Sequence, residues 1–318
     1  MKVFVAGASG AIGRPLVGQL VAAGHQVTGM TRHPERAAEI EAAGARSAVC
    51  DVFDGDGLRA AVAEARPEVV VNQLTAFPAE LDPRKPDVYE ATNRIRTEGT
   101  RLLVGAAQAA GAGRMVAQSV SFIYEPVGGW VKTESDPVIS SAPEPFAAAM
   151  RAMLDLERQV TRADAIEGVV LRFGFFYGPH TAFARDGYNA AEFGRRRFPV
   201  IGKGEGVSSF IHVDDAAAAT VAACERGEPG VYNIVDDDPA PMREWVPAYA
   251  EALGARRPLR IPAWLAKLAA GRALVSMASA GRGAENAKAK RELGWEPLHA
   301  SWRQGFREAL RQPLDAAH

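Results

Sequence analysis

The sequence predicts an α/β fold in which helices cover both faces of a parallel sheet. Short apolar segments alternate with amphipathic segments through the first half of the chain, the pattern of strand–helix–strand units. One of them, Glu68–Leu74, is a nearly continuous apolar run, as expected for a strand covered on both faces. A glycine-rich turn, Gly7–Gly13, directly follows the first apolar segment. Together these features predict a doubly wound, Rossmann-type parallel sheet.

Each strand and helix of the first half can be assigned in order. The expected strands are Met1–Ala6, Gln26–Met30, Ser47–Cys50, Glu68–Leu74, Arg114–Gln118 and Gly168–Phe173. The expected helices are Pro15–Ala23, Pro34–Ala42, Gly57–Ala65, a long helix from Pro86 to Ala110, and Pro145–Ala163. Because crossovers between parallel strands are nearly always right-handed, this order places helices on both faces of the sheet.

The alternation stops after residue 179, and a second region begins. Residues 180–209 read as irregular, and from Pro239 onward the sequence is helical with several proline breaks. Between them we expect a strand at Phe210–Val213, a helix at Asp214–Arg226 and a strand at Val231–Val235. The predicted domains are therefore a dinucleotide-binding domain of residues 1–179, completed by 210–235, and a smaller, mostly helical substrate lobe of 180–209 and 236–318. This C-terminal lobe would cover a ligand at the carboxyl ends of the strands.

The glycine-rich turn predicts the pyrophosphate site of a dinucleotide. Gly7 permits the tight turn, Gly10 lets the backbone approach a phosphate, and Gly13 lets the helix pack closely on the strand. The helix N-terminus then directs free N–H groups toward the anion. The residues expected to contact the coenzyme here are Gly7, Ser9, Gly10, Ala11, Ile12 and Gly13.

The end of the second strand predicts which dinucleotide binds. An acidic residue there hydrogen-bonds the ribose 2′-hydroxyl of NAD, whereas an arginine accommodates the 2′-phosphate of NADP. This chain has Thr31 and Arg32 at that point and Arg36 one helical turn on, with no acidic residue at the strand end. We therefore expect NADP(H) as the coenzyme, with NAD(H) less favoured. The alternative for Arg32 is a solvated surface arginine.

Further motifs extend over roughly residues 1–310. They are the glycine turn, Asp51 after the third strand, Val69–Ala76 (VVVNQLTA), Glu98–Thr100, Leu171-Arg172, Tyr177–Pro179 and Ile211–Asp215. In this order they resemble the extended short-chain dehydrogenase/reductase family, also called NAD-dependent epimerase/dehydratases. The resemblance implies that family's fold and coenzyme class. It extends the expected coenzyme contacts to Asp51, Val52, Gln73, Leu74, Thr75, Asn93 and Phe173. Asp51 could instead cap a helix, and Asn93 could hold a water or lie on plain surface.

The resemblance also implies a proton-transfer pair that this chain lacks. The family carries Tyr-x-x-x-Lys on the helix after the fifth strand, where the lysine lowers the pKa of the tyrosine. One register of that helix places Phe146 and Met150 at the two positions, and another places Ala149 and Met153 there. All four side chains are apolar and cannot transfer a proton.

Other groups are candidates to replace the missing pair. Counting back from Tyr124 places the family's catalytic serine at Val120, so the neighbouring Ser119 is our candidate for binding a substrate carbonyl. A turn hydroxyl that bonds backbone is the alternative for Ser119. Tyr124, Tyr177 and His180 follow strand ends and are candidate proton donors, with structural packing as the alternative for both tyrosines.

The resemblance further indicates a small substrate. Sugar-nucleotide members carry an arginine just before the strand at 210–213, and Ser208 stands there in this chain. Arg195–Arg197 could substitute for it, although a charge run in a loop is usually solvated. The C-terminal lobe instead offers the apolar side chains Phe193, Trp264, Leu265, Leu268 and Met277. We therefore expect a small, non-nucleotide carbonyl, alkene or imine substrate.

Composition limits the function classes. The chain has 37 Lys+Arg and 38 Asp+Glu, a formal charge of -1, so it has no basic excess for binding nucleic acid or a membrane surface. Cys50 and Cys224 are expected to be buried free thiols, and the histidines show no metal-ligand spacing. With no signal peptide or membrane span in the pattern, we expect a cytoplasmic protein. Family members often dimerise, and the apolar face of Ala147–Leu156 is consistent with a homodimer.

The leading hypothesis is an NADP(H)-dependent oxidoreductase that passes hydride between the nicotinamide and a small substrate. A second hypothesis is a sensor or regulatory protein that binds NADP(H) without turnover. A third retains catalysis but makes it non-redox, with the fold reused by an isomerase or epimerase. Consumption of NADPH in the presence of ketones, enones and imines would distinguish the first hypothesis from the other two.

Overall fold

The computed structural model describes residues 1–77, 87–140 and 146–311. Its centre is a seven-stranded sheet with the order β12-β7-β5-β4-β1-β2-β3, in which every neighbouring pair is parallel. The strands are β1 (Lys2–Ala6), β2 (Gln26–Thr31), β3 (Arg46–Val49), β4 (Val69–Asn72), β5 (Arg114–Val120), β7 (Glu167–Phe173) and β12 (Gly230–Ile234). This confirms the predicted fold class.

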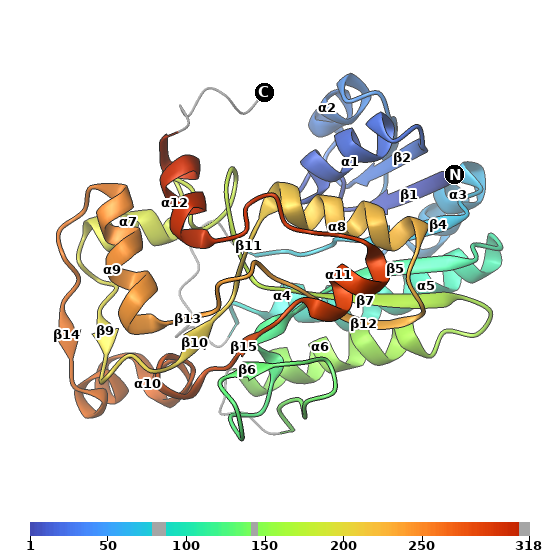
Figure 1. The fold of residues 1–318 in the computed structure, drawn as a ribbon. Helices are drawn as coiled ribbons and strands as arrows, with labels where there is room; N and C mark the ends of the chain where they lie inside the picture. Colours follow the sequence, from blue (N-terminus) through green and yellow to red (C-terminus); the bar gives the residue numbers. More distant parts are fainter. Residues whose placement is uncertain (78–86, 141–145, 312–318) are drawn as a thin grey trace.

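Helices cover both faces of this sheet (Figure 1). One face carries α1 (Gly13–Ala22), α2 (Ala37–Ala42, after a 3-10 turn at Pro34–Arg36), α8 (Val213–Glu225) and α11 (Ala287–Leu293). The other carries α3 (Gly55–Ala65), α5 (Thr100–Ala109) and α6 (Phe146–Thr161). In α6 the buried Met150, Met153 and Val160 recur at helical spacing and face the sheet. The apolar face of α6 that we expected to support a dimer is therefore buried within the chain itself.

The long helix expected from Pro86 to Ala110 is interrupted, and Pro86 lies outside the described residues. α4 (Glu90–Arg94) runs into a π-helical turn at Ile95–Gly99 and continues as α5. The Thr100 hydroxyl donates to the Ile95 carbonyl, five residues back, at 3.4 Å. Such turns are rare and occur mostly at functional sites.

A second group of elements lies beside the sheet, at the left of Figure 1. It contains α7 (Tyr188–Gly194), α9 (Met242–Leu253), α10 (Ala263–Ala280) and α12 (Trp302–Arg311), with the short strands β9 (Val200–Ile201), β10 (Val207–Ser208), β13 (Ala240–Pro241) and β14 (Arg260–Ile261). Their core is aromatic and includes Tyr177, Phe183, Phe193, Phe210, Trp245, Tyr249 and Phe306. Residues 180–209, which we expected to be irregular, thus contain one helix and two short strands.

Four short strands connect the two groups. β8 (Phe175–Tyr177) pairs in parallel with β11 (Phe210–His212), and β6 (Val131–Lys132) pairs with β15 (Gly283–Ala284). The strand expected at Phe210–Val213 is therefore present, but it lies outside the central sheet.

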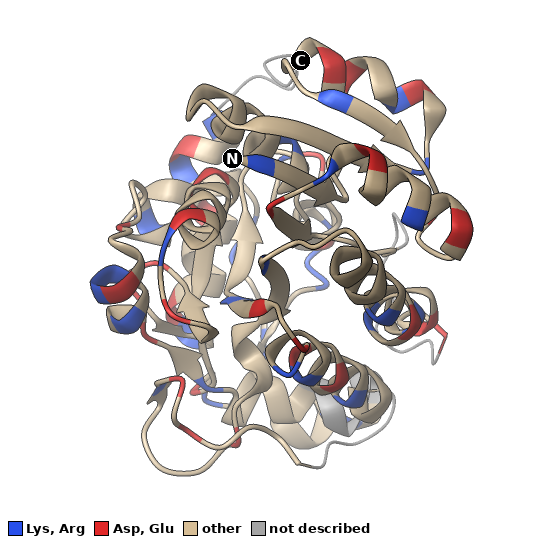
Figure 2. Ribbon diagram, turned by 90° about the vertical axis from the view of Figure 1, so that its right-hand side faces the viewer, with Lys and Arg blue, Asp and Glu red and all other residues tan. Residues whose placement is uncertain are grey.

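The surface charges are mixed in sign. Figure 2 shows basic and acidic residues interspersed along the helices. Cys50 and Cys224 are free and buried, as predicted. Within the described part of the chain, no helix is long and apolar enough to span a membrane.

Candidate functional site

The glycine turn has the geometry of an anion-binding turn. Gly7 has φ of +90°, a conformation that favours glycine, and the amides of Gly7 and Ala8 donate to the Met30 carbonyl at 3.3 and 3.1 Å. A Cβ on Gly13 would lie 2.1 Å from the Gly7 carbonyl oxygen, so a side chain there would push α1 away from the turn. No side chain caps the N-terminus of α1. In its first turn the Arg14 amide already donates to the Gly10 carbonyl at 3.0 Å and Pro15 has no N–H, so among the described residues only the Gly13 amide remains available to an anion.

Arginines flank the end of β2, where a coenzyme's adenosine ribose is expected. Thr31 is buried there and shares a hydrogen bond with the Ser9 hydroxyl at 3.1 Å. No carboxylate among the described residues forms an ion pair with Arg32 or Arg36. Two cations without acidic partners suit a phosphate monoester better than a hydroxyl.

Two buried amides lie unpartnered at the next strand ends. Both polar atoms of the Gln73 side chain, just after β4, are buried without a hydrogen-bond partner among the described residues, and so is Asn93 Oδ1 on α4. Unpaired buried polar atoms are costly and indicate a missing ligand or water. Of the other residues expected here, Val52 is buried, Leu74 is half-buried and Thr75 is exposed. A dinucleotide laid along these strand ends would fit this donor and acceptor set.

Asp51 does not cap a helix. The cap of α3 is Asp54, whose carboxylate accepts the Gly57 amide at 3.0 Å. Asp51 accepts the amide of Phe53 at 2.9 Å and is otherwise exposed. Its free carboxylate oxygen therefore remains available to a ligand.

Ser119 and Tyr124 belong to a buried structural network. The Ser119 hydroxyl donates to Glu157 Oε1 at 2.6 Å, and Arg172 donates to both oxygens of the same carboxylate at 2.8 and 2.6 Å. Arg172 Nη1 also donates to the Tyr124 hydroxyl, which in turn donates to Asn233 Oδ1 at 2.6 Å. Burial raises the pKa of Tyr124, against the opposing effect of Arg172. Both hydroxyls thus have protein partners in this structure, and the catalytic roles expected for Ser119 and Tyr124 stay predictions.

The other two predicted proton donors lie elsewhere. Tyr177 is fully buried against His212 and Phe306, and burial raises its pKa far above its usual range. His180 is exposed, has φ of +61°, and its charged neighbours include Arg14 and Arg36, which places it on the glycine-turn side of the molecule. Burial, followed by Arg14, lowers the pKa of His180.

Phe173, predicted to contact the coenzyme, has a fully buried side chain that belongs to the sheet's core. Phe193 is likewise buried in the aromatic core, whereas Trp264 and Leu268 are exposed on α10. Phe193 therefore stabilises the core of the C-terminal lobe and does not line a site.

Apolar side chains fill the place where the family's proton-transfer pair would stand. Ala149, Met150 and Met153 of α6 pack with Val120 at the end of β5 in one buried cluster. The ring of Tyr89, from the turn before α4, packs against this cluster and lies 5.6 Å from the ring of Phe146. Tyr89 therefore packs beside the place of the missing pair, where Tyr124 also belongs to the cluster, and sequence reasoning did not consider Tyr89.

Arg96, in the π-helical turn, was also missed. It is buried although it is an arginine, and its guanidinium carbon lies 5.9 Å from the centre of the Phe77 ring. A signal existed in the sequence: Arg96, Gly99 and Leu103 share one face at helical spacing, and the last two are types expected in a core.

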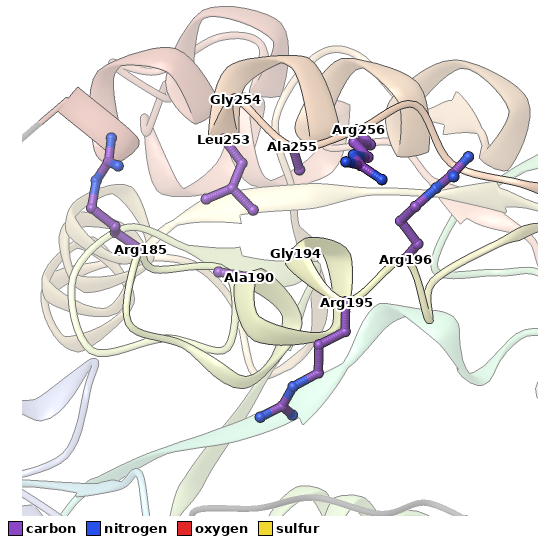
Figure 3. Close-up of a pocket in the computed structure, with 9 residues that line it drawn as sticks. All are labelled: Arg185, Ala190, Gly194, Arg195, Arg196, Leu253, Gly254, Ala255 and Arg256. Atoms are coloured by element: carbon purple, nitrogen blue, oxygen red, sulfur yellow. The ribbon is translucent and has the colours of Figure 1, made fainter.

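A surface hollow of about 590 Å³ lies apart from these residues, between α7 and the end of α9. It is lined by Arg185, Arg195, Arg196 and Arg256 together with small residues. Figure 3 shows the side chains of Arg185, Arg195 and Arg196 pointing in different directions instead of converging. Arg185 donates to the Leu310 carbonyl and Arg195 pairs with Glu192, so both already have partners. The hollow is not part of the candidate active site.

Residues 3–235 match the NAD dependent epimerase/dehydratase family. The chain belongs to this family. A "3-diazoavenalumate denitrifying reductase" from a Streptomyces species is 46% identical over 307 residues, which cover 96% of this chain and 99% of the relative. A "4-hydroxy-2-methyl-3-oxo-4-farnesyl-3,4-dihydroquinoline-1-oxide ketoreductase" from Stigmatella aurantiaca is 29% identical, covering 98% of this chain and 96% of the relative.

Among solved structures, a human epimerase family protein crystallised with NADPH superposes with a TM-score of 0.74 at 22% identity, covering 98% of this chain and all of the other (100%). Family membership and the reductase relatives confirm the predicted enzyme class, an NAD(P)-dependent oxidoreductase.

Proposed function

We propose that this chain is an NADPH-dependent reductase of a small aromatic diazo compound, an acceptor whose reduction needs no acid from the protein. The observation that carries the proposal is the apolar cluster of Ala149, Met150, Met153 and Val120, which stands where a proton donor would be needed. The diazo acceptor is favoured by the 46% identical relative, whose name describes it as a denitrifying reductase of 3-diazoavenalumate.

The residues described above would hold the coenzyme along the carboxyl ends of the strands. The glycine turn and the Gly13 amide at the start of α1 would receive the pyrophosphate, and the unpaired amide atoms of Gln73 and Asn93 would hydrogen-bond other polar groups of the coenzyme. Arg32 and Arg36 would receive a 2′-phosphate, which supports NADPH over NADH. The bound coenzyme supplies a hydride from C4 of its nicotinamide.

The chemistry of an aryl diazonium group suits a site without an acid. The hydride electron pair forms the new C–H bond, and dinitrogen leaves with the pair of the broken C–N bond. The substrate loses its positive charge and the coenzyme becomes NADP⁺, so no proton is consumed. Ketone reduction would leave an alkoxide that must be protonated, yet Ser119, Tyr124 and Tyr177 are all buried in other contacts. The protein's contribution is then positioning and exclusion of water.

The C-terminal elements support a role in positioning. Residues 180–209 and 236–311 share one aromatic core, although they are separated by α8 and β12. This arrangement supports the proposal that they form a substrate lobe which folds as a unit beside the strand ends.

The test is an assay with NADPH and a panel of acceptors: an aryl diazonium, a ketone, an enone and an imine. We expect NADPH oxidation and one dinitrogen released per coenzyme with the diazonium alone, above the rate measured without protein. Coenzyme deuterated at C4 should place its label in the new C–H bond, and deuterated solvent should not. Turnover of the ketone but not the diazonium would refute the proposal. Tight NADPH binding with no acceptor consumed would favour the sensor hypothesis.

A further inference from the structure

Arg96 is a buried cation without an anionic partner among the described residues. The residue is 7% exposed, and no carboxylate or hydrogen-bond acceptor among the described residues contacts its guanidinium. Burial lowers its pKa to about 10. A guanidinium carries five donors in a rigid fork, and proteins rarely bury one without satisfying them. No nitrogen of Arg96 is among the fully buried atoms that lack a partner, so its donors are open to a group other than the described residues.

The π-helical turn explains how this side chain becomes buried. The turn inserts one residue into the helix, so that the neighbours Ile95 and Arg96 both lie on the buried side. The same turn is fixed against α6, because Gln159 Nε2 donates to the Thr97 carbonyl at 3.1 Å. Two residues earlier, Arg94 points outward and pairs with Glu98 at 2.8 Å. The helix thus presents one arginine to solvent and one to the interior.

The ring of Phe77 lies beside the buried guanidinium, and the ring of Tyr89 lies next to Phe77. Its carbon lies 5.9 Å from the centre of the Phe77 ring, and Phe77 meets Tyr89 edge-on at 6.5 Å. The Ala76 amide donates to Thr92 Oγ1 at 3.1 Å, which ties the segment after β4 to α4. Phe77 is 44% exposed, an unusual value for a phenylalanine. Rings beside a fork of N–H donors suit a flat ligand that ends in an oxyanion.

We infer that Arg96, with the rings of Phe77 and Tyr89, forms a subsite that holds the oxyanion of a flat, conjugated acceptor, namely its carboxylate. This inference rests on the proposed function and names the feature by which the acceptor is recognised. Carboxylate and guanidinium pair through two parallel hydrogen bonds, which fix orientation as well as position. The coenzyme pyrophosphate offers the same oxyanion chemistry. The glycine turn and the N-terminus of α1 already suit it, so we assign Arg96 to the acceptor.

Three variants test whether Arg96 binds the carboxylate of the acceptor or the pyrophosphate of the coenzyme. Arg96→Met removes the charge at similar volume, Arg96→Lys keeps the charge but not the fork, and Arg94→Met is the matched control on the solvent side of the same helix. Each is titrated with NADPH, with an unsaturated aromatic acid, and with the methyl ester of that acid, the last two in the presence of NADP⁺. Calorimetry reports binding whether or not the compound is turned over.

We expect Arg96→Met to weaken binding of the acid by about tenfold or more, as for loss of a charged hydrogen bond, while binding of the ester and of NADPH is unchanged. Arg96→Lys should give an intermediate loss for the acid, and Arg94→Met none. If NADPH binding weakens instead, the oxyanion is the coenzyme's and the inference is overturned. It is equally overturned if acid and ester are affected alike. Should Arg96→Met fail to fold, the acid-to-ester ratio of Arg96→Lys decides.

This design keeps the inference separate from the proposed function. Failure of diazonium reduction would refute the proposed reaction, yet selective binding of the acid through Arg96 would still be measurable. Conversely, if Arg96→Met reduces the diazonium compound at the same rate as the parent protein, the proposed reaction is retained and the proposed subsite is refuted.

Discussion

The sharpest test of the site's architecture is the pair of variants Glu157→Gln and Ser119→Ala. Glu157 joins α6 to β5 and β7, because its carboxylate accepts from Ser119 and from two nitrogens of Arg172. Both members of the ion pair are less than 10% exposed, with side-chain values of 8% for Glu157 and 6% for Arg172. Removing the carboxylate charge leaves a buried guanidinium uncompensated, since arginine cannot release its proton.

The magnitudes follow from which group loses its partner. Breaking a buried ion pair from one side costs about 3–5 kcal/mol, so Glu157→Gln should lower the free energy of unfolding by that amount. Ser119→Ala removes one of three hydrogen bonds to a carboxylate that keeps its arginine, which costs about 1–2 kcal/mol. Asp155→Asn, which breaks the surface pair with Arg158 on the same helix, should cost less than about 1 kcal/mol and serves as the control.

The assay is urea denaturation followed by circular dichroism, together with coenzyme turnover measured well below the unfolding temperature. We expect the order Glu157→Gln, then Ser119→Ala, then Asp155→Asn in lost stability, and turnover of Ser119→Ala close to that of the parent protein. A Ser119→Ala variant with unchanged stability and turnover lowered a hundredfold or so would restore the serine as a catalytic group and refute the structural interpretation.

Three further predictions concern the coenzyme and pH. Burial raises the pKa of Asp236 to about 8, so the folded protein holds a proton that the unfolded chain releases near pH 4. The free energy of unfolding should therefore fall as the pH rises between about 4 and 8. Asp236→Asn should flatten this slope in urea titrations at several pH values. The double variant Arg32→Ala, Arg36→Ala should weaken NADPH binding by tenfold or more, about the effect of a charged hydrogen bond, and leave NADH binding unchanged in fluorescence titrations. Equal losses of affinity for the two coenzymes would contradict the assignment of NADPH. Gln73→Met should weaken the binding of both coenzymes without lowering the melting temperature of the protein, because the Gln73 amide has no partner among the described residues. A lower melting temperature would show that this amide is satisfied within the fold.

The sequence predicted the sheet because its signals are local. Runs of apolar residues mark β1 and β4, and two glycines of the first turn are required locally, Gly7 by its positive φ and Gly13 by its close approach to the Gly7 carbonyl. These features depend on neighbours within a few positions. They also placed the coenzyme turn, the part of the site that the fold itself creates.

The direction of side chains at the end of β5 was harder to predict. Met115 and Ala117 face the layer of α5 and α6, and Ser119 follows them by strand alternation. This alternation of side chains along β5 by itself directs the Ser119 hydroxyl toward α6, where Glu157 lies. The prediction of a carbonyl-binding serine followed the family's motif and did not weigh this alternation.

Tyr177 could not be placed from local pattern, and for Arg96 the only local signal was the helical face that it shares with Gly99 and Leu103. Tyr177 is buried by Phe306 of α12, more than a hundred residues away, and that contact has no local signature. The π-helical turn at Ile95–Gly99 depends on packing against α6, so the segment reads in sequence as one uninterrupted helix. In both places contacts between distant segments override periodicity.

The loss of an acid and the burial of Arg96 are linked by electrostatics. The apolar cluster around Met150 and Met153 lowers the local dielectric, which strengthens the attraction between Arg96 and an oxyanion. The same surroundings would penalise an isolated diazonium cation, because the side chains of the cluster are apolar apart from Tyr124, whose hydroxyl is engaged by Asn233 and Arg172. An acceptor that carries its carboxylate to Arg96 and its diazonium group into the cluster enters with no net charge, and its negative end is neutralised by the protein. The remaining positive end is then the least stabilised charge in the site, and it is the one that hydride addition removes. If the proposed function holds, an apolar site beside the buried Arg96 would favour an anionic substrate whose reactive end is electron-poor, and it would need no proton donor.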